Sequence, residues 1–181
     1  TAAAAKAFSK IGIKVKGVHE FEDPAEAIHR AAGTFIGGGN TFLLLKQLWE
    51  NALVEPLRKR VADGMPYMGT SAGSNVAGRT INTTNDMPIV YPPSFEALGL
   101  MPFNVNPHYL DPNPNSTHMG ETRETRINEF HTQSDIPVVG LREGSWLRFS
   151  GDQVELKGPH AARVFRAGQV PFEHEPGLLE L

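Results

Sequence analysis

The 181-residue sequence contains no cysteine, and this absence excludes several kinds of chemistry. The chain can form no disulfide, no zinc-thiolate site and no cysteine nucleophile. It also lacks an excess of basic residues: the net charge is -3 and the pI is near 6.1, which argues against a nucleic-acid-binding surface. The longest apolar run is too short to span a bilayer, and the alanine-rich start does not have the form of a signal peptide. We therefore expect a soluble, cytoplasmic protein that binds neither nucleic acid nor a membrane.

The pattern of apolar residues predicts an α/β fold. With 40% hydrophobic residues, the chain is long enough to bury one substantial core, so we expect a single domain over residues 1–181. Strands alternate with helices through the first two thirds, which indicates a mostly parallel sheet flanked by helices. The last third predicts a small antiparallel meander, followed by a peripheral tail after Gly168. Helices are expected near 1–11, 23–32, from 41, 55–63 and 121–131, and strands near 13–18, 34–36, 65–68, 103–106, 138–141, 146–149, 154–156 and 162–165.

The stretch Gly69-Thr70-Ser71-Ala72-Gly73 is the most informative part of the chain. It has the G-x-S-x-G form of a nucleophile elbow, in which the serine sits on a tight turn between a strand and a helix. The flanking glycines allow the two backbones to approach, and the N–H groups that open the helix point at the group that the serine attacks. A turn that contains glycine and serine is also common between a strand and a helix that have no catalytic function. Ser71 is therefore a candidate nucleophile that needs support from the rest of the chain.

A second glycine-rich turn, Gly37-Gly38-Gly39, follows the strand predicted at 34–36. Its unshielded N–H groups suit an anion, although the turn has neither a Walker lysine nor dinucleotide-binding spacing. A tight turn without a ligand is the simpler interpretation. Because the carboxyl ends of parallel strands meet at one edge of the sheet, the turn is well placed to supply a second oxyanion donor beside Ser71.

His108 is the best candidate for a catalytic base, because it follows a short strand at Pro107 and precedes an irregular loop. Glu143 also follows a buried strand, where a carboxylate could orient an imidazole. Asp86, in a polar loop, is either a simple turn residue or a buried carboxylate near the site. His118 lies in the loop predicted over 109–120 and could be confused with a ligand; the other histidines, His19, His29, His131, His160 and His174, look like surface residues. We find no metal-ligand spacing and expect neither a metal site nor a cofactor.

Several motifs occur together in one order: GGGNTFLLLKQL, GTSAGSN, TTNDMPIV, NPH, GETRETRI and GLREGSW. In this order and at these separations they resemble peptidase E, the family of aspartyl dipeptidases. That family shares its fold with class I glutamine amidotransferases, whose elbow carries cysteine instead of serine. The resemblance implies a serine peptidase that acts on dipeptides with an N-terminal aspartate. Relatives begin with a further strand and helix before Thr1, so we expect this chain to lack that unit.

The resemblance assigns the nucleophile to Ser71 and the base to His108, as the residues themselves suggest. The third member falls on Asp86 or on Glu143, and we favour Glu143 as the residue that orients His108. The N–H groups of Ala72 and of Gly38 or Gly39 would hold the oxyanion.

Substrate recognition requires a cation, because a bidentate guanidinium satisfies the aspartyl carboxylate. Arg123 and, less strongly, Arg126 are the candidates, and Asn85 is placed with the substrate-binding residues. Both arginines could instead be solvated charges on a helix.

Two other functions remain open. Cyanophycinase-type enzymes share the fold and a similar elbow, but they cleave a polymer of aspartate with β-linked arginine. A non-catalytic binding protein on the same scaffold is the other alternative, and it would have an unreactive Ser71. Neither the oligomeric state nor the preferred second residue of the dipeptide follows from the sequence.

Overall fold

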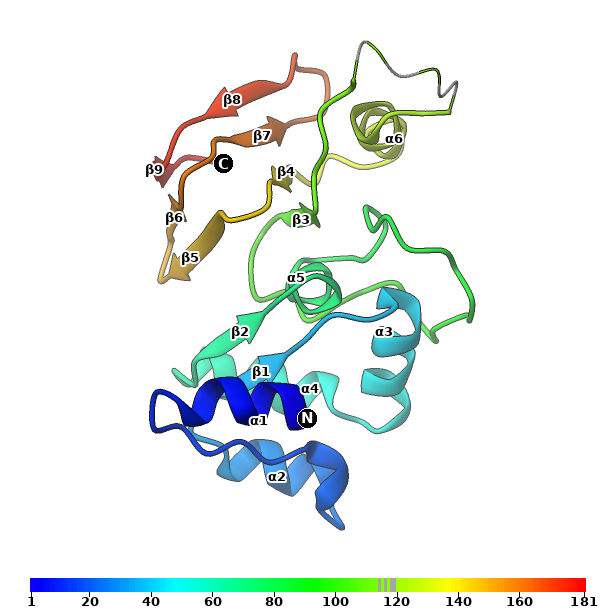
Figure 1. Ribbon diagram of the computed structural model, residues 1–181. Coiled ribbons are helices and arrows are strands. Elements are labelled where there is room, and N and C mark those ends of the chain that lie inside the picture. The colour runs from blue at the N-terminus through cyan, green and yellow to red at the C-terminus, as the bar shows by residue number, and fades with distance from the viewer. Residues whose placement is uncertain (114, 116, 118–119) are drawn as a thin grey trace.

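The computed structural model describes residues 1–113, 115, 117 and 120–181, and it has α/β architecture (Figure 1). None of the helices in these described ranges combines the length and the hydropathy of a membrane-spanning segment. The helices are α1 (Ala2–Ser9), the short 3-10 helix η1 (Val18–Glu20), α2 (Pro24–Arg30), α3 (Thr41–Glu50), α4 (Val54–Ala62), α5 (Ala72–Ala77) and α6 (Arg123–Phe130). The strands are β1 (Thr34–Ile36), β2 (Tyr67–Gly69), β3 (Asn104–Pro107), β4 (Val138–Leu141), β5 (Trp146–Ser150), β6 (Gln153–Lys157), β7 (Ala162–Phe165), β8 (Phe172–His174) and β9 (Gly177–Leu179).

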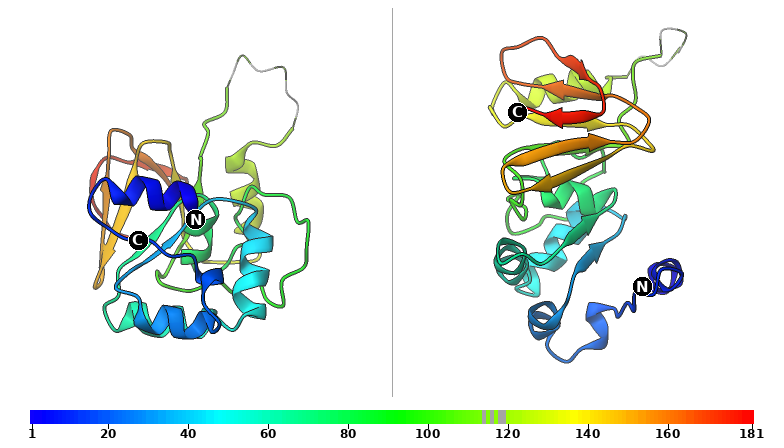
Figure 2. Two further views of the ribbon diagram at one scale, coloured as in Figure 1. Left: turned by 60° about the horizontal axis from the view of Figure 1, so that its bottom comes forward. Right: turned by 90° about the vertical axis from the view of Figure 1, so that its left-hand side faces the viewer.

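The strands form three sheets. In the amino-terminal half, β1 and β2 pair in parallel. A second sheet has the order β3-β4-β7-β8, in which β3 and β4 are parallel and the other pairs are antiparallel. The third sheet has the antiparallel order β5-β6-β9. The parallel pairing expected within a single sheet is thus present in β1-β2 and β3-β4, but these two pairs belong to separate sheets (Figure 2).

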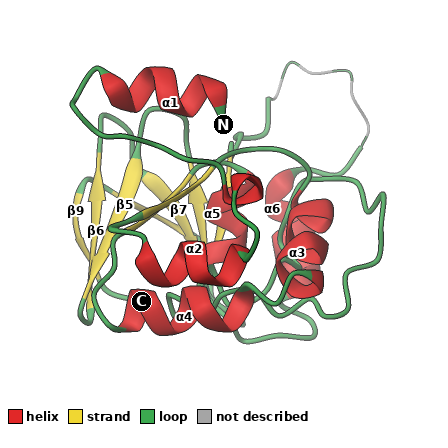
Figure 3. Ribbon diagram, turned by 90° about the horizontal axis from the view of Figure 1, so that it is seen from below, coloured by secondary structure: helices red, strands yellow, loops and turns green. Residues whose placement is uncertain are grey.

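The start of α2 follows the prediction from its capping residues. The Asp23 carboxylate accepts hydrogen bonds from the N–H groups of Ala25 and Glu26, and Pro24 occupies the first helical position. This arrangement satisfies two N–H groups that would otherwise lack partners at the helix end. Figure 3 shows α2 and α4 side by side beneath the strands.

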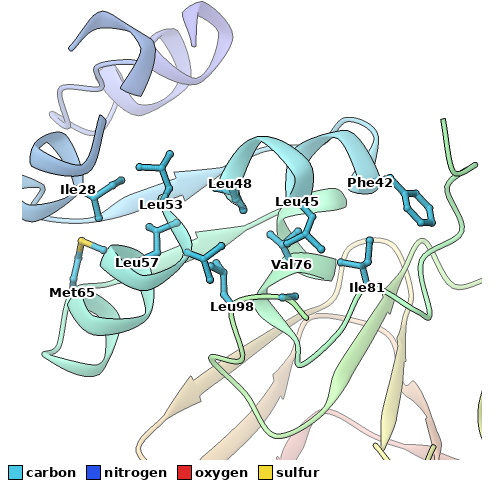
Figure 4. Close-up of a cluster of buried hydrophobic side chains, with 12 residues drawn as sticks. Ile28, Phe42, Leu45, Leu48, Leu53, Leu57, Met65, Val76, Ile81 and Leu98 are labelled. Atoms are coloured by element: carbon cyan, nitrogen blue, oxygen red, sulfur yellow. The ribbon is translucent and has the colours of Figure 1, made fainter. Parts of the chain in front are cut away.

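The two largest of three hydrophobic clusters among the described residues form the cores of the two halves of the molecule. The first packs α3, α4 and α5 together, with Leu45, Leu57 and Val76 almost completely buried (Figure 4). The second lies between β3, β4, β6 and β7 and includes Phe103, Val139 and Val164. Each buried side chain of this size contributes about 1.5–3 kcal/mol relative to the exposed state.

Three sequence predictions of local structure are wrong. Residues 13–18 do not form a strand, and Ile13 is exposed because no described strand lies beside this segment to pair with it. The tail after Gly168 is not peripheral, since β8 pairs with β7 and β9 pairs with β6. The expected meander is divided: β5 and β6 pair as predicted, but β7 pairs with β4 and β8. Of the loop predicted over 109–120, His118 lies outside the described residues.

Candidate active site

Ser71 lies on a strained turn between β2 and α5. Its φ of 54° and ψ of -114° are unusual for a residue that has a Cβ. The backbones on either side approach closely: a Cβ at Gly69 would lie 2.4 Å from the Gly73 carbonyl oxygen, and one at Gly73 would lie 2.0 Å from the Ile36 carbonyl oxygen. Glycine is therefore required at both positions. This geometry is that of a nucleophile elbow.

The Tyr67 hydroxyl supports the elbow, although the sequence analysis did not single out this residue. The Tyr67 O–H donates to the Gly73 carbonyl oxygen at 2.7 Å, and the Ser74 hydroxyl donates to the Gly69 carbonyl oxygen at 3.1 Å. Burial raises the pKa of Tyr67, so the phenol stays protonated and remains a donor. The signal in the sequence is the position of Tyr67, inside the strand that leads into the elbow.

The glycine turn after β1 lies directly against Ser71. A Cβ at Gly38 would lie 3.2 Å from the Ser71 Cβ and 3.5 Å from its Oγ. The Thr70 N–H donates to the Ile36 carbonyl oxygen at 3.0 Å, which ties the turn to the elbow. Among the contacts of the described residues, the N–H groups of Gly38, Gly39 and Ala72 have no protein acceptor. Of these three residues, Gly38 lies against Ser71 and Ala72 follows it directly, so donors without a protein acceptor in the described structure lie next to the candidate nucleophile.

His108 and Glu143 form a hydrogen-bonded pair through His108 Nδ1 and Glu143 Oε1. The parallel register pairs Pro107 with Leu141, so the residues that follow β3 and β4 emerge side by side. The Tyr109 N–H donates to the Leu141 carbonyl oxygen at 3.1 Å and continues this pairing past the end of β3. His108 has a φ of 55°, a second left-handed residue in the site. With Nδ1 held by the carboxylate, Nε2 is the ring nitrogen left for proton transfer.

Ser71, Gly38, His108 and Glu143 line one pocket of about 1650 Å³. The pocket therefore brings together the serine, Gly38 of the glycine turn, the histidine and Glu143, which the sequence analysis favoured over Asp86. Within the described part of the chain, no hydrogen bond joins Ser71 to His108. Catalytic hydrogen bonds are often long or absent in structures without substrate.

Asp86 and Asn85 hold the backbone around the pocket. Asp86 Oδ2 accepts from the Thr41 N–H at 2.7 Å, at the start of α3, and Asp86 makes no hydrogen bond to His108 among the described contacts. Asn85 Nδ2 donates to the Pro107 carbonyl oxygen at 3.2 Å, next to His108. Neither Asp86 nor Asn85 is among the residues that line the pocket.

A buried polar network around Asn75 and Asn106 was not found from the sequence. Asn75 Nδ2 donates to the Thr41 and Thr84 hydroxyls, and Asn106 Nδ2 donates to the Thr83 carbonyl oxygen at 2.7 Å. The signal for it is that Asn104 and Asn106 alternate with apolar residues in a completely buried strand, where polar side chains require partners.

The two candidate arginines differ in their surroundings. Arg123 is half-buried at the start of α6, and its Nε has no hydrogen-bond partner among the described residues. Burial, and to a smaller extent the positive charge of Arg126, lower the pKa of Arg123, while the nearby Tyr109 acts in the opposite direction. Arg126 is exposed and pairs with Glu121 at 3.6 Å. Neither arginine lines the pocket.

Three other arginines, Arg58, Arg142 and Arg148, do line the pocket. Arg58 is held by the Ala97 and Leu98 carbonyl oxygens. Arg142 forms ion pairs with Asp111 and Glu173. Arg148 has no ion pair with the described residues, and sequence reasoning did not single it out.

Comparison with known proteins identifies the family. The model of the family described as Peptidase family S51 matches residues 1–157. The chain is 56% identical over 173 residues to a peptidase E of Streptomyces coelicolor, a match that covers 96% of this chain and 71% of the relative. It is 51% identical over 168 residues to a Drosophila melanogaster protein named probable alpha-aspartyl dipeptidase, covering 92% of this chain and 70% of that protein.

Solved structures show the same fold. A candidate peptidase E protein from Listeria monocytogenes superposes with a TM-score of 0.67 at 22% identity, covering 87% of this chain and 77% of that chain. A peptidase from an acI-B1 actinobacterium superposes with a TM-score of 0.64 at 18% identity, covering 93% of this chain and 73% of that chain. These likenesses confirm the predicted fold class. Because the family model spans most of the sequence and two relatives exceed 50% identity, this chain belongs to peptidase family S51.

Proposed function

We propose that this protein is a serine-type dipeptidase that hydrolyses dipeptides with an N-terminal aspartate. The observation that carries the proposal is the hydrogen-bonded pair of His108 and Glu143 in the same pocket as the strained Ser71. The names of the relatives, peptidase E and alpha-aspartyl dipeptidase, support the same activity. A cytoplasmic location fits this activity and stays a prediction.

In the proposed mechanism, His108 Nε2 accepts the Ser71 hydroxyl proton as Ser71 Oγ attacks the peptide carbonyl carbon. The resulting imidazolium is stabilised by Glu143, which keeps Nδ1 as the protonated nitrogen. His108 then gives the proton to the leaving amine, and the C–N bond breaks to leave an acyl-enzyme. Water repeats the attack with His108 again as the base, which releases the N-terminal amino acid.

The oxyanion of each tetrahedral intermediate is assigned to the N–H groups of Ala72 and of Gly38 or Gly39. The contact of Gly38 with Ser71 and the lack of protein acceptors for these donors in the described structure support this assignment. Removal of one such donor typically costs about a hundredfold or more in rate.

Asp86 and Asn85 are assigned supporting roles. The bond from the Thr41 N–H to Asp86 holds the helix that follows the glycine turn, and Asn85 holds the carbonyl group that precedes His108. We therefore assign the role of orienting His108 to Glu143 alone. Asn85 remains close enough in sequence and contact to the site to take part in substrate binding.

We assign recognition of the substrate's aspartyl carboxylate to Arg123. A carboxylate would supply the partner that its buried Nε lacks among the described residues, and Tyr109, the residue after His108, lies beside it. Arg126 is the weaker candidate, since it is exposed and already pairs with Glu121.

The test is hydrolysis of Asp-Leu, Glu-Leu, Asn-Leu, Leu-Asp and β-Asp-Arg by the purified chain and by Ser71→Ala. The proposal expects cleavage of Asp-Leu alone and no activity in the variant. Cleavage of β-Asp-Arg alone would support a cyanophycinase-type hydrolase. No cleavage, together with a Ser71 that does not react with serine-directed phosphonates, would support a binding protein.

A further inference from the structure

The bonded pair of His108 and Glu143 lies near the surface, so burial does not hold the pair in place. The His108 side chain is about half exposed, and the Glu143 side chain is more exposed still. Among the described residues, neither side chain has a hydrogen-bond partner besides the other. The geometry of the pair therefore depends on the two backbone segments that carry it, one after β3 and one after β4.

One guanidinium group joins these two segments. Arg142, which directly precedes Glu143, donates from Nε and Nη2 to the two carboxylate oxygens of Asp111 at 2.9 and 2.6 Å. Asp111 follows His108 by three residues. A bidentate pair of this kind fixes the orientation of the two groups as well as their separation. It supplements the backbone pairing that continues past the end of β3.

All five N–H donors of Arg142 are used. Besides the two bonds to Asp111, the guanidinium donates to the Glu173 carboxylate at 2.7 and 3.0 Å and to the Ala161 carbonyl oxygen at 2.7 Å. Its Cζ lies 5.6 Å from the centre of the Tyr109 ring. Because a guanidinium has no further donor, Arg142 cannot bind a substrate carboxylate unless one of these bonds breaks. The group is therefore suited to holding the protein rather than a ligand.

Glu173 connects Arg142 to the sheet. It belongs to β8, and its carboxylate also accepts from Arg163 of β7 at 3.3 Å. Arg163 lies opposite Glu173 in the β7-β8 register and opposite Gly140 in the β4-β7 register. Figure 1 shows β3, β4, β7 and β8 side by side. Because strands hold side chains more precisely than loops do, the sheet gives Arg142 a fixed position.

We propose that Arg142 and Asp111 are positioning residues of the site. They act through the two backbone segments and hold Glu143 Oε1 at His108 Nδ1, and Glu173 fixes Arg142 in turn. The effect on kcat rests on the proposed function, whereas the effect on the histidine ring requires no turnover. No contact with the reacting atoms is assigned to Arg142, Asp111 or Glu173.

The tautomer of the neutral His108 ring tests this proposal. Glu143 favours a proton on Nδ1, because a carboxylate accepts hydrogen bonds and does not donate them. Long-range proton–nitrogen NMR spectra of histidine-labelled protein in alkaline buffer measure the share of each tautomer, and His108→Gln assigns the signal. We expect the Nδ1–H form to predominate in the wild type and to fall clearly in Arg142→Lys and in Asp111→Asn. Unchanged tautomer populations in either folded variant, or a wild type without the Nδ1–H form, would overturn the proposal.

The two variants remove the bidentate pair in different ways. Lysine keeps the positive charge at position 142 but has no planar fork, so it cannot match two carboxylates at once. Asparagine keeps the shape of Asp111 and removes its charge. Because the Asp111 side chain is 56% exposed, Asp111→Asn is the milder change and can be measured even if Arg142→Lys does not fold.

Arg60→Lys is the matched control. Arg60 is a partly buried arginine of α4 whose Nη2 donates to the Ala31 carbonyl oxygen at 2.8 Å, and it does not line the pocket. This variant should lose stability in urea unfolding without any change in the His108 tautomer. An equal tautomer shift in Arg60→Lys would overturn the proposal, because the shift would then report general destabilisation.

Kinetics provide a second test, because a residue that acts through Glu143 has little effect once the Glu143 carboxylate is absent. Arg142→Lys should lower kcat for Asp-Leu about tenfold or more and leave KM within a fewfold range, since displacement of a group by about 1 Å can cost on the order of a hundredfold in rate. In the Glu143→Gln background, the same substitution should change kcat by less than about twofold. Equal losses in both backgrounds would overturn the proposal.

The outcomes for the positioning role and for the proposed function are distinguishable. Tautomer shifts in the variants, without hydrolysis of any dipeptide by the wild type, would reject the proposed function and support the positioning role. Hydrolysis of Asp-Leu by the wild type, with an unchanged tautomer in the variants, would support the proposed function and reject the positioning role.

Discussion

Gly38 lies against Ser71 so closely that a Cβ at position 38 would stand 3.2 Å from the Ser71 Cβ and 3.5 Å from its Oγ. The two residues follow the paired ends of β1 and β2, whose register matches Ile36 with Gly69. Proximity of the glycine turn to the serine is therefore a direct consequence of parallel pairing, since both strands end at the same edge.

Gly38→Ala is expected to lower kcat by about ten- to a hundredfold with little loss of stability, because the added methyl group displaces Ser71 Oγ or the donor N–H. Steady-state kinetics on Asp-Leu and urea unfolding measure the two effects. Gly33→Ala is the matched control, since its Cβ would meet Pro66 only at an ordinary distance of 3.5 Å. Equal effects of both substitutions would contradict a role for Gly38 in the site.

Glu143→Gln is expected to lower kcat at least a hundredfold while leaving KM within a fewfold range. The glutamine amide no longer stabilises the imidazolium that forms on His108 during attack. The free energy of unfolding should hardly change, because the Glu143 side chain is 75% exposed. A variant with nearly full kcat would remove Glu143 from the mechanism.

Asp86→Ala is expected to lower the free energy of unfolding by about 1–2 kcal/mol, because the Thr41 N–H at the start of α3 loses its acceptor. Asp86→Asn keeps an oxygen acceptor, so it should retain most of the stability and most of kcat. Urea unfolding and kinetics on both variants distinguish this supporting role from catalysis. Complete loss of activity in a stable Asp86→Asn would show that the carboxylate itself takes part in the reaction.

Arg123→Met should abolish the preference for Asp-Leu over Asn-Leu by raising KM for Asp-Leu, because the guanidinium that pairs with the substrate carboxylate is lost. Arg126→Met is the control and should keep the preference. The ratio of kcat/KM for the two dipeptides is the measurement. Unchanged selectivity in Arg123→Met would exclude Arg123 as the partner of the substrate carboxylate. The next candidate would be Arg148, the pocket-lining arginine without an ion pair among the described residues.

Lowering the pH should destabilise the protein, in part because the carboxylates that pair with Arg142 become protonated. Hydrogen bonds from Arg142 hold the pKa of Asp111 below its ordinary value of 3.8 and that of Glu173 below 4.5. Because both pKa values are lower in the folded than in the unfolded state, the associated stability is present above about pH 4.5. It is lost as the pH falls through the folded values.

The measurement for this prediction is the free energy of urea unfolding between pH 6 and pH 2 for the wild type and for Arg142→Met. The variant should be less stable at pH 6 and should lose less stability on acidification. Both carboxylates are substantially exposed, so solvent screening keeps the difference small. Parallel pH curves for the two proteins would contradict the assignment.

Local sequence determined the parts of this protein that depend on a few neighbouring residues. Asp23 and Pro24 predict the start of α2, because a cap and a fixed φ act within one turn. The glycines around Ser71 predict the elbow, because only glycine permits the approach of Gly69 to Gly73. The glycine turn, His108 and Glu143 could be assigned to one edge from the alternation of strands and helices.

Tertiary structure alone decided which partners these groups have. The two candidate carboxylates differ in their contacts: Glu143 bonds His108 just beyond the paired ends of β3 and β4, whereas Asp86 bonds the start of α3. Strand formation likewise depends on neighbouring strands. Apolar and polar residues alternate over 13–18 as in a strand, but no other strand lies beside this segment among the described residues. The polar tail, by contrast, forms β8 and β9, which pair with β7 and β6. A strand exists only where a second edge satisfies its peptide groups, and that requirement is not encoded in any single stretch of sequence.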